Sequence, residues 1–285
     1  MLSSAQPLEL AVGNVIRRVL YLVREEYLNA VKNMPENRDT VQTSRSLQTI
    51  LTPNQLMDYS IPIKELKHTI MEGIAELVQE IETSYEHIAE QALEHIHADE
   101  VILTCGESKT VLEFFKEAAK KRQFKVIVLE SAPGMDGQRM ARSLSLAGIN
   151  TTLITDSAVF AMMARVNKVV IAASKVVANG GLIAKTGTYN VALAAKEMSV
   201  PLVCVTGVFK LTPIYPHDLD GLNDLISPAQ LLSNDGCAKV MPLNPALYYV
   251  PPELVDLFIT NFGGHHPSYI YRLLVEYYCP EDYDF

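Results

Sequence analysis

The sequence lacks three features that would place it in a specialised class. It has no apolar run near the roughly 20 residues of a membrane-spanning helix, and its first ten residues do not resemble a secretory signal. Positive charge is scarce, since 24 lysines and arginines face 33 aspartates and glutamates. A net charge of -9 argues against a general nucleic-acid binder, which needs a basic field. What is left is a globular chain of 285 residues, 48% of them hydrophobic.

Cysteine is also rare, and its spacing shows no metal-type pairing. The four cysteines are widely separated: Cys105, Cys204, Cys237 and Cys279. We therefore expect free thiols in a reducing compartment, and a cytosolic protein. Two histidine pairs, His95–His97 and His265–His266, lack the third and fourth ligands of a zinc site. We expect them to cap or bridge the ends of elements, and we expect no metal or cofactor.

The first periodic segment predicts an amphipathic helix from Ala11 to about Val31, because apolar residues recur there at spacings of three and four. Arg17, Arg18 and Arg24 belong to this helix. We expect their side chains to face solvent or a partner.

A second long helix is predicted after a polar interval. Residues 33–58 lose the apolar periodicity and contain several prolines and asparagines, which indicates a mobile linker. Apolar residues then recur at helical spacing from Pro62 to Ala92. Residues 1–98 are therefore predicted to form an N-terminal helical domain.

From residue 99 to residue 285 the pattern changes to short β-rich runs that alternate with helical segments. The predicted strands are Val101–Thr104, Lys125–Leu129, Thr151–Thr155, Lys168–Ala172 and Pro201–Thr206. The predicted helices are Lys109–Lys121, Gln138–Ala147, Ser157–Ala164 and Leu182–Glu197. Such alternation predicts an α/β fold, a Rossmann-like domain with a mainly parallel sheet covered on both faces.

The stretch from Lys168 to Lys196 has the strand, glycine turn and helix of a doubly wound sheet, in which ligands bind at the carboxyl ends of strands. Two other motifs carry weaker signals. Gly106 to Lys109 follows a strand but lacks the glycine that a phosphate-binding loop places before its lysine, so we expect a polar turn. Cys105 is the one tempting nucleophile, but no activating base is evident in the sequence, and a buried thiol is expected.

The C-terminal part is rich in loops and tyrosines. We expect a short helix from Pro252 to Phe258, a turn at Gly263–Pro267 and a helix from Ser268 to Tyr277. Aromatic and arginine-bearing tails often form interfaces, although a tail folded back on its own sheet explains the composition equally well.

Several segments together resemble the superfamily of methylthioribose-1-phosphate isomerases and the regulatory subunits of eukaryotic translation initiation factor 2B. The segments shared with the whole superfamily are Val101–Thr104, Glu130–Pro133, Gly137–Arg139, Thr155–Ser157, Ala178–Gly180 and Lys185–Tyr189. The match is closer to its beta-subunit branch, through Gly13–Asn14, Arg17–Arg18, Gln91–His97, Met163–Lys168, Tyr249–Leu254 and Pro267–Leu273. The resemblance covers essentially the whole chain.

The resemblance implies a pocket that lacks the catalytic residues of the isomerases. Aligned on these motifs, the catalytic cysteine of the isomerases falls on Gly106, their catalytic aspartate on Ser174, and an arginine expected before Pro133 on Ala132. A serine hydroxyl does not replace a carboxylate as general base without an activating partner. The residues that still match a phosphate-facing pocket are Arg139, Asn179, Gly180 and Lys185.

The resemblance therefore implies a non-catalytic regulatory subunit of the guanine-nucleotide exchange factor for translation initiation factor 2. It implies a heterodimer with a delta subunit, further contacts with alpha, gamma and epsilon subunits, and initiation factor 2 as the substrate. The implied interface residues are Tyr249, Pro251, Tyr269, Tyr271 and Arg272. Two alternatives stay open: a sugar-phosphate isomerase that uses Cys105 in a shifted register, and a protein that binds a sugar phosphate or nucleotide without turnover.

Overall fold

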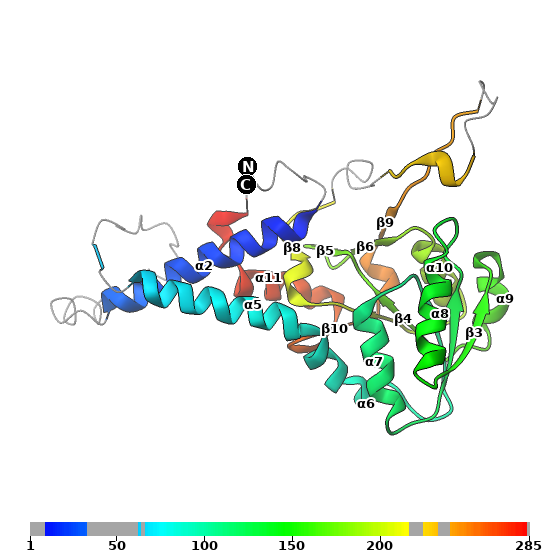
Figure 1. Ribbon diagram of the computed structural model, residues 1–285. Coiled ribbons are helices and arrows are strands. Elements are labelled where there is room, and N and C mark those ends of the chain that lie inside the picture. The colour runs from blue at the N-terminus through cyan, green and yellow to red at the C-terminus, as the bar shows by residue number, and fades with distance from the viewer. Residues whose placement is uncertain (1–8, 33–61, 64–65, 217–224, 233–239, 284–285) are drawn as a thin grey trace.

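The computed structural model describes residues 9–32, 62–63, 66–216, 225–232 and 240–283. Two long helices, α2 (Leu10–Lys32) and α5 (Leu66–Glu90), pack against each other at one end of the molecule (Figure 1). Both helices were predicted, while the predicted linker at 33–58 lies outside the described residues. None of the described helices has the length and apolar character needed to cross a membrane.

The main sheet has seven strands in the order β11-β10-β7-β4-β1-β2-β3, and every neighbouring pair is parallel except β10 with β11. In chain order the strands are β1 (Val101–Cys105), β2 (Lys125–Leu129), β3 (Asn150–Ile154), β4 (Lys168–Ala172), β7 (Leu202–Val205), β10 (Leu257–Thr260) and β11 (Gly263–His265). The first five match the strands predicted from apolar runs, which confirms the α/β fold.

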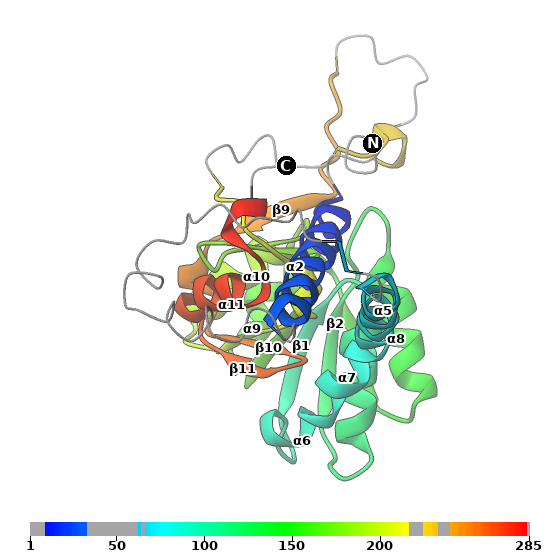
Figure 2. The same ribbon diagram turned by 90° about the vertical axis from the view of Figure 1, so that its left-hand side faces the viewer.

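Helices cover both faces of this sheet. Successive strand residues point to opposite sides, so neighbouring residues of one strand pack against different helices. Ile102 packs into the core on one face, beneath α5, α6 (Ala92–His95), α7 (Lys109–Ala119) and α8 (Asp136–Leu146). Its neighbour Leu103 packs into the core on the other face, with α9 (Val159–Met163), α10 (Thr188–Glu197) and α11 (Ile270–Tyr277). Figure 2 shows α7 and α8 on one side of the sheet and α10 and α11 on the other.

A second sheet, of four strands, was not predicted. Its buried residues join the core that contains Leu103. Its order is β8-β5-β6-β9, with β8 (Leu211–Thr212), β5 (Lys175–Val177), β6 (Leu182–Lys185) and β9 (Leu247–Val250). The predicted helix Leu182–Glu197 is therefore wrong in its first part. Gly187 has a φ of 98°, a left-handed conformation that favours glycine, and α10 begins only after it. Residues 182–185 pair instead with β5 and β9.

The C-terminal predictions are corrected in the same way. The helix expected through Phe258 is one 3-10 turn, Pro252–Leu254, followed by β10, which pairs in parallel with β7. The expected turn at 263–267 contains β11, the antiparallel neighbour of β10. A short apolar run does not distinguish strand from helix, and the neighbouring β7 decides here. The final predicted helix is confirmed as α11.

The arginines of α2 do not all face outward. Arg17 is only 5% exposed, and its guanidinium donates hydrogen bonds to the backbone oxygens of Asp282 (2.9 Å) and Tyr283 (3.1 Å). Arg24 forms ion pairs with Glu281 and Asp282. The expectation that Arg17 faces solvent or a partner chain is wrong, because the C-terminal residues of its own chain cover it.

Candidate functional site

A small cavity lies where the sheet-based prediction placed a ligand, at the carboxyl ends of β1 and β4. Its volume is about 110 Å³. It is lined by Cys105, Gly106, Glu107, Ser108, Ala172, Ala173, Ser174, Lys185, Thr188 and Lys210. The main sheet thus supplies the floor, β6 and α10 supply one wall, and the segment before β8 supplies Lys210.

Cys105 is held as a protonated thiol. Its sulfur lies 3.4 Å from the hydroxyl oxygen of Thr188, which begins α10. Burial raises the pKa of Cys105 to about 11, and the hydrogen bond between Cys105 and Thr188 offsets only part of that effect. Near neutral pH the sulfur therefore stays protonated, and a thiol is a much weaker nucleophile than a thiolate.

Gly106 and Ser174 both line the cavity. Gly106 has a φ of 71°, and its N–H donates to the hydroxyl of Ser131 at 2.9 Å. A methyl group added to Gly106 would lie 3.1 Å from the Cδ atom of Lys185, so the lysine side chain passes directly over this glycine.

A cluster of charged residues continues from the lining of the cavity, where Glu107 and Lys185 lie, to Asp136, the first residue of α8. One carboxylate oxygen of Asp136 contacts the ammonium of Lys185, and the other contacts the guanidinium of Arg139. Arg139 also donates from Nε to Glu107 at 2.7 Å. Burial opposes ionisation of Asp136, but the hydrogen bonds and charges of Lys185 and Arg139 outweigh it and lower its pKa. Four charges of alternating sign therefore form one cluster.

The other two predicted pocket residues lie elsewhere. Asn179 and Gly180 form the turn between β5 and β6, where the Asn179 amide donates to the hydroxyl of Tyr249 at 2.8 Å. Gly180 has a φ of 83° and lies against the backbone of Pro267. Within the described lining of the cavity, Lys185 is the only member of the predicted set. The turn thus contacts Tyr249 and Pro267 in the C-terminal part of the chain.

Asp136, Lys210 and Thr188 were not predicted as site residues. Lys210 donates to the backbone oxygen of Ala173 at 3.0 Å, and burial lowers its pKa. Asp136 lies two residues before the predicted helix Gln138–Ala147 and carried no motif signal. Its role depends on two cations that come from different elements.

The predicted interface residues form a partly exposed group in the C-terminal segment. Tyr269 stacks on His265 with ring centroids 5.3 Å apart, and the guanidinium of Arg272 lies 5.5 Å from the Tyr269 ring. Tyr271 is 56% exposed, and Pro251 is partly buried. The structure thus places an aromatic and arginine-bearing surface on α11, and its use as an interface stays a prediction.

The histidine pairs take local roles. His266 caps the 3-10 turn Pro267–Tyr269 by accepting from the N–H of Ser268 at 3.3 Å. The His97 ring lies 3.0 Å from the guanidinium of Arg122. Within the described residues, no three histidine, cysteine or acidic side chains lie close enough together to hold a metal ion.

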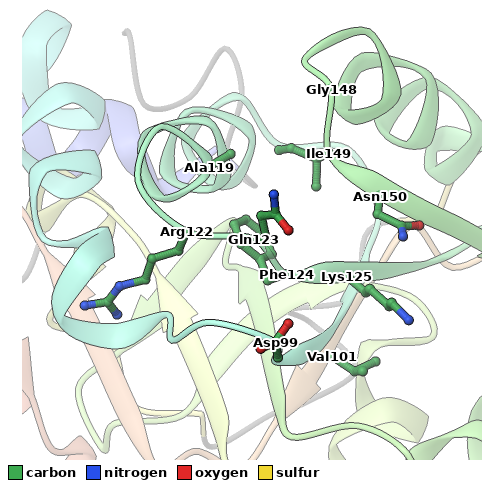
Figure 3. A pocket seen from close by; sticks show the side chains of 10 residues that line it. All are labelled: Asp99, Val101, Ala119, Arg122, Gln123, Phe124, Lys125, Gly148, Ile149 and Asn150. Carbon is green, nitrogen blue, oxygen red and sulfur yellow. The ribbon is translucent and has the colours of Figure 1, made fainter.

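A larger hollow of about 470 Å³ lies at the opposite, amino-terminal edge of the sheet. Figure 3 shows that the charged ends of Arg122 and Lys125 point away from each other there. Because charged groups converge at the carboxyl edge and not here, we take the smaller cavity as the candidate site.

The family follows from the comparison with known proteins. The model of the initiation factor 2 subunit family matches residues 1–267. The chain belongs to this family.

Individual relatives divide into two functional groups. Translation initiation factor eIF2B subunit beta of Dictyostelium discoideum is 46% identical over 319 aligned positions, covering 99% of this chain and 82% of that protein. Ribose 1,5-bisphosphate isomerase of Archaeoglobus fulgidus is 30% identical over 232 positions, covering 78% of this chain and 72% of that protein.

Solved structures agree with the first group. The crystal structure of eIF2B beta from Chaetomium thermophilum superimposes with a TM-score of 0.76 at 29% identity, covering 100% of this chain and 78% of that one. A chain of the tetrameric eIF2B-beta2-delta2 complex from C. thermophilum has a TM-score of 0.72 at 28% identity, covering 97% of this chain and 77% of that one.

Proposed function

We propose that this chain is a non-catalytic regulatory subunit of the guanine-nucleotide exchange factor for translation initiation factor 2. In that role it supports the exchange of GDP for GTP and the control of this exchange by phosphorylation. The observation that carries the proposal is the 46% identity, over 99% of the chain, to an eIF2B beta subunit. The fold similarity to solved eIF2B beta chains supports it.

In this proposal the chain forms a heterodimer with a delta subunit, and alpha, gamma and epsilon subunits complete the exchange factor in the cytosol. Initiation factor 2 is the substrate of the assembly. The solved beta2-delta2 complex of a similar protein supports the pairing. Residues 1–98 and 99–285 would act as a helical domain and a Rossmann-like domain.

The interface role falls to the surface on α11 and to the end of β9. Tyr271 and Arg272 are exposed, while Tyr269 is held in place by stacking on His265. Tyr249 and Pro251 join this surface to the turn at Asn179. Exposed aromatic and arginine side chains on a rigid support are typical of protein interfaces.

The absence of catalysis rests on the cavity. Gly106 and Ser174 stand where the resemblance to isomerases implies a cysteine and an aspartate, and neither side chain supplies a nucleophile or a general base near neutral pH. The thiol of the neighbouring Cys105 has a pKa raised to about 11. Arg139 and Lys185 are in this proposal remnants of a phosphate-binding frame, whereas Asn179 and Gly180 contact Tyr249 and Pro267 outside the cavity.

The test of assembly is co-purification. The full chain is expressed with and without a delta subunit, and the mass of the product is measured by native mass spectrometry. We expect a heterodimer with delta and poor solubility without it. A stable, soluble monomer that is indifferent to delta contradicts the proposal.

A sugar-phosphate isomerase is the second candidate, favoured by the 30% identity to ribose 1,5-bisphosphate isomerase. Incubation with ribose 1,5-bisphosphate or methylthioribose 1-phosphate tests it directly. We expect no turnover. Turnover that Cys105→Ser abolishes would favour the isomerase over the regulatory subunit.

A further inference from the structure

The charge cluster at the cavity contains its own anion. We propose that Asp136 occupies the place of an anionic ligand, so that its carboxylate, held between Lys185 and Arg139, keeps phosphorylated molecules out of the cavity. The inference deepens the proposed function and rests on its claim that the cavity is not catalytic.

Both cations that a phosphate would use are already paired. Asp136 divides its two oxygens between Lys185 and Arg139, which come from β6 and α8. Arg139 has a second carboxylate partner in Glu107, at 2.7 Å. A phosphate would have to displace a covalently tethered carboxylate, whose effective concentration next to its partners is high.

The position of the lysine side chain adds to this effect. Lys185 runs over Gly106, and its ammonium ends at Asp136. The remaining space of about 110 Å³ is well below the roughly 300 Å³ of ordinary small-molecule sites. The ion pair therefore neutralises the lysine, and the space left in the cavity is smaller than a sugar phosphate needs.

An ionised Asp136 would also repel a second anion. The cations beside it lower its pKa against the opposing effect of burial, so it carries its charge near neutral pH. Two anions that share one site disfavour each other strongly. Ala132, which stands where the family resemblance implies an arginine, adds no positive charge, and its N–H donates to Asp156 at 2.8 Å.

Removing the carboxylate should expose a usable anion site. In Asp136→Asn, Lys185 and Arg139 lose their shared partner, and Lys210 lies on the inner wall of the same cavity. Two lysines then line one small space, with Arg139 near its edge, an arrangement that resembles the phosphate clamps of other proteins. The amide keeps the size of the carboxylate, so the fold of α8 is retained.

The experiment is a calorimetric titration of the full chain with inorganic phosphate and with ribose 5-phosphate, in a buffer free of other polyvalent anions. We expect Asp136→Asn to bind phosphate at least about tenfold more tightly than the unmodified chain, because a like charge has been removed and the ammonium of Lys185 has lost its carboxylate partner, whereas Arg139 keeps Glu107. Glu117→Gln is the matched control, since it makes the same charge change on α7, where Glu117 pairs with Lys120. It should leave phosphate binding unchanged.

The double variant Asp136→Asn with Lys185→Met should lose the gained binding. The inference is overturned if the unmodified chain binds phosphate as tightly as Asp136→Asn, if neither binds, or if the double variant still binds. Assembly with a delta subunit is measured on the same proteins. Failure to assemble contradicts the proposed function, whereas the phosphate titration alone decides the role of Asp136.

Discussion

The cavity and the C-terminal segment differ in whether their polar side chains are paired within the chain or exposed on the surface. At the cavity, Asp136 satisfies two cations of its own chain, and the space left is small. In the C-terminal segment, residues 247–283, Arg17 donates a hydrogen bond to the backbone of Asp282, and the turn at Gly180 packs against the backbone of Pro267. In the same segment, 56% of the surface of Tyr271 is exposed. A pocket whose charged groups pair with each other has few free groups to bind a ligand, whereas an anchored and exposed surface is suited to a partner protein.

The largest expected effect comes from the anchor of the C-terminal segment. Arg17→Ala should lower the free energy of unfolding by about 3 kcal/mol, because it leaves the buried carbonyl group of Asp282 and the partly buried one of Tyr283 without their donor. Urea denaturation followed by circular dichroism measures the change. Arg142→Ala, an exposed arginine of α8, is the control and should cost less than about 0.5 kcal/mol. Equal effects would mean that the segment is not anchored through Arg17.

The turn between β5 and β6 is the second support. In Gly180→Ala the added methyl would lie 2.4 Å from the carbonyl oxygen of Pro267, so the variant should lose about 2 kcal/mol and loosen the C-terminal segment. Gly148→Ala is the matched control, since Gly148 also has a positive φ, of 78°, but has nothing within 4 Å of the added atom. It should lose only about 1 kcal/mol, from backbone strain alone. Thermal unfolding measures the loss of stability in both variants, and hydrogen exchange of α11 shows whether Gly180→Ala alone loosens the C-terminal segment.

The outward face should matter for assembly and not for folding. Tyr271→Ala should weaken binding to a delta subunit by about 1.5 kcal/mol, roughly tenfold in Kd, while the unfolding free energy stays within about 0.5 kcal/mol. Phe160→Ala, on α9, removes an aromatic ring that is 49% exposed and serves as the control. Surface plasmon resonance measures both. A loss of stability without a loss of binding would assign α11 to the core and not to an interface.

The smallest effect tests the cavity. The pKa of Asp136 is lower in the folded chain than the ordinary value of an aspartate, 3.8, so its ion pairs stabilise the fold above that pH. This contribution disappears as the pH falls through the lower folded value. The unmodified chain should therefore lose up to about 1 kcal/mol more than Asp136→Asn on acidification from about pH 5 to pH 2. Glu117→Gln, in an exposed pair, should follow the unmodified chain. Parallel curves for all three proteins would show that Asp136 is not stabilised by its neighbours.

Much of the fold could be predicted from local pattern. The runs at 125–129 and 168–172 are buried strands at the predicted bounds, because a nearly continuous apolar run between polar turns is typical of a parallel strand. Leu182–Lys185 was mistaken for a helix because a run of three apolar residues suits either structure, and the pairing with β5 and β9 makes it a strand. The same holds for Leu257–Thr260 beside β7.

The candidate site was predictable only in part. The family motifs pointed to Lys185 and Arg139, which the structure brings together. The same motifs grouped Asn179 and Gly180 with them, whereas these two residues contact Tyr249 and Pro267. Asp136 had no motif and was missed.

The sequence by itself determined the α/β class, the first five strands of the main sheet, and the membership of the chain in its family, because these depend on periodicity and on residues near one another along the chain. Only the tertiary structure decided which charges meet. Asp136 and Lys185 are 49 residues apart, and Arg17 and Asp282 are 265 apart. Whether such groups face solvent, a ligand or each other depends on the packing of distant elements, and local pattern does not record it.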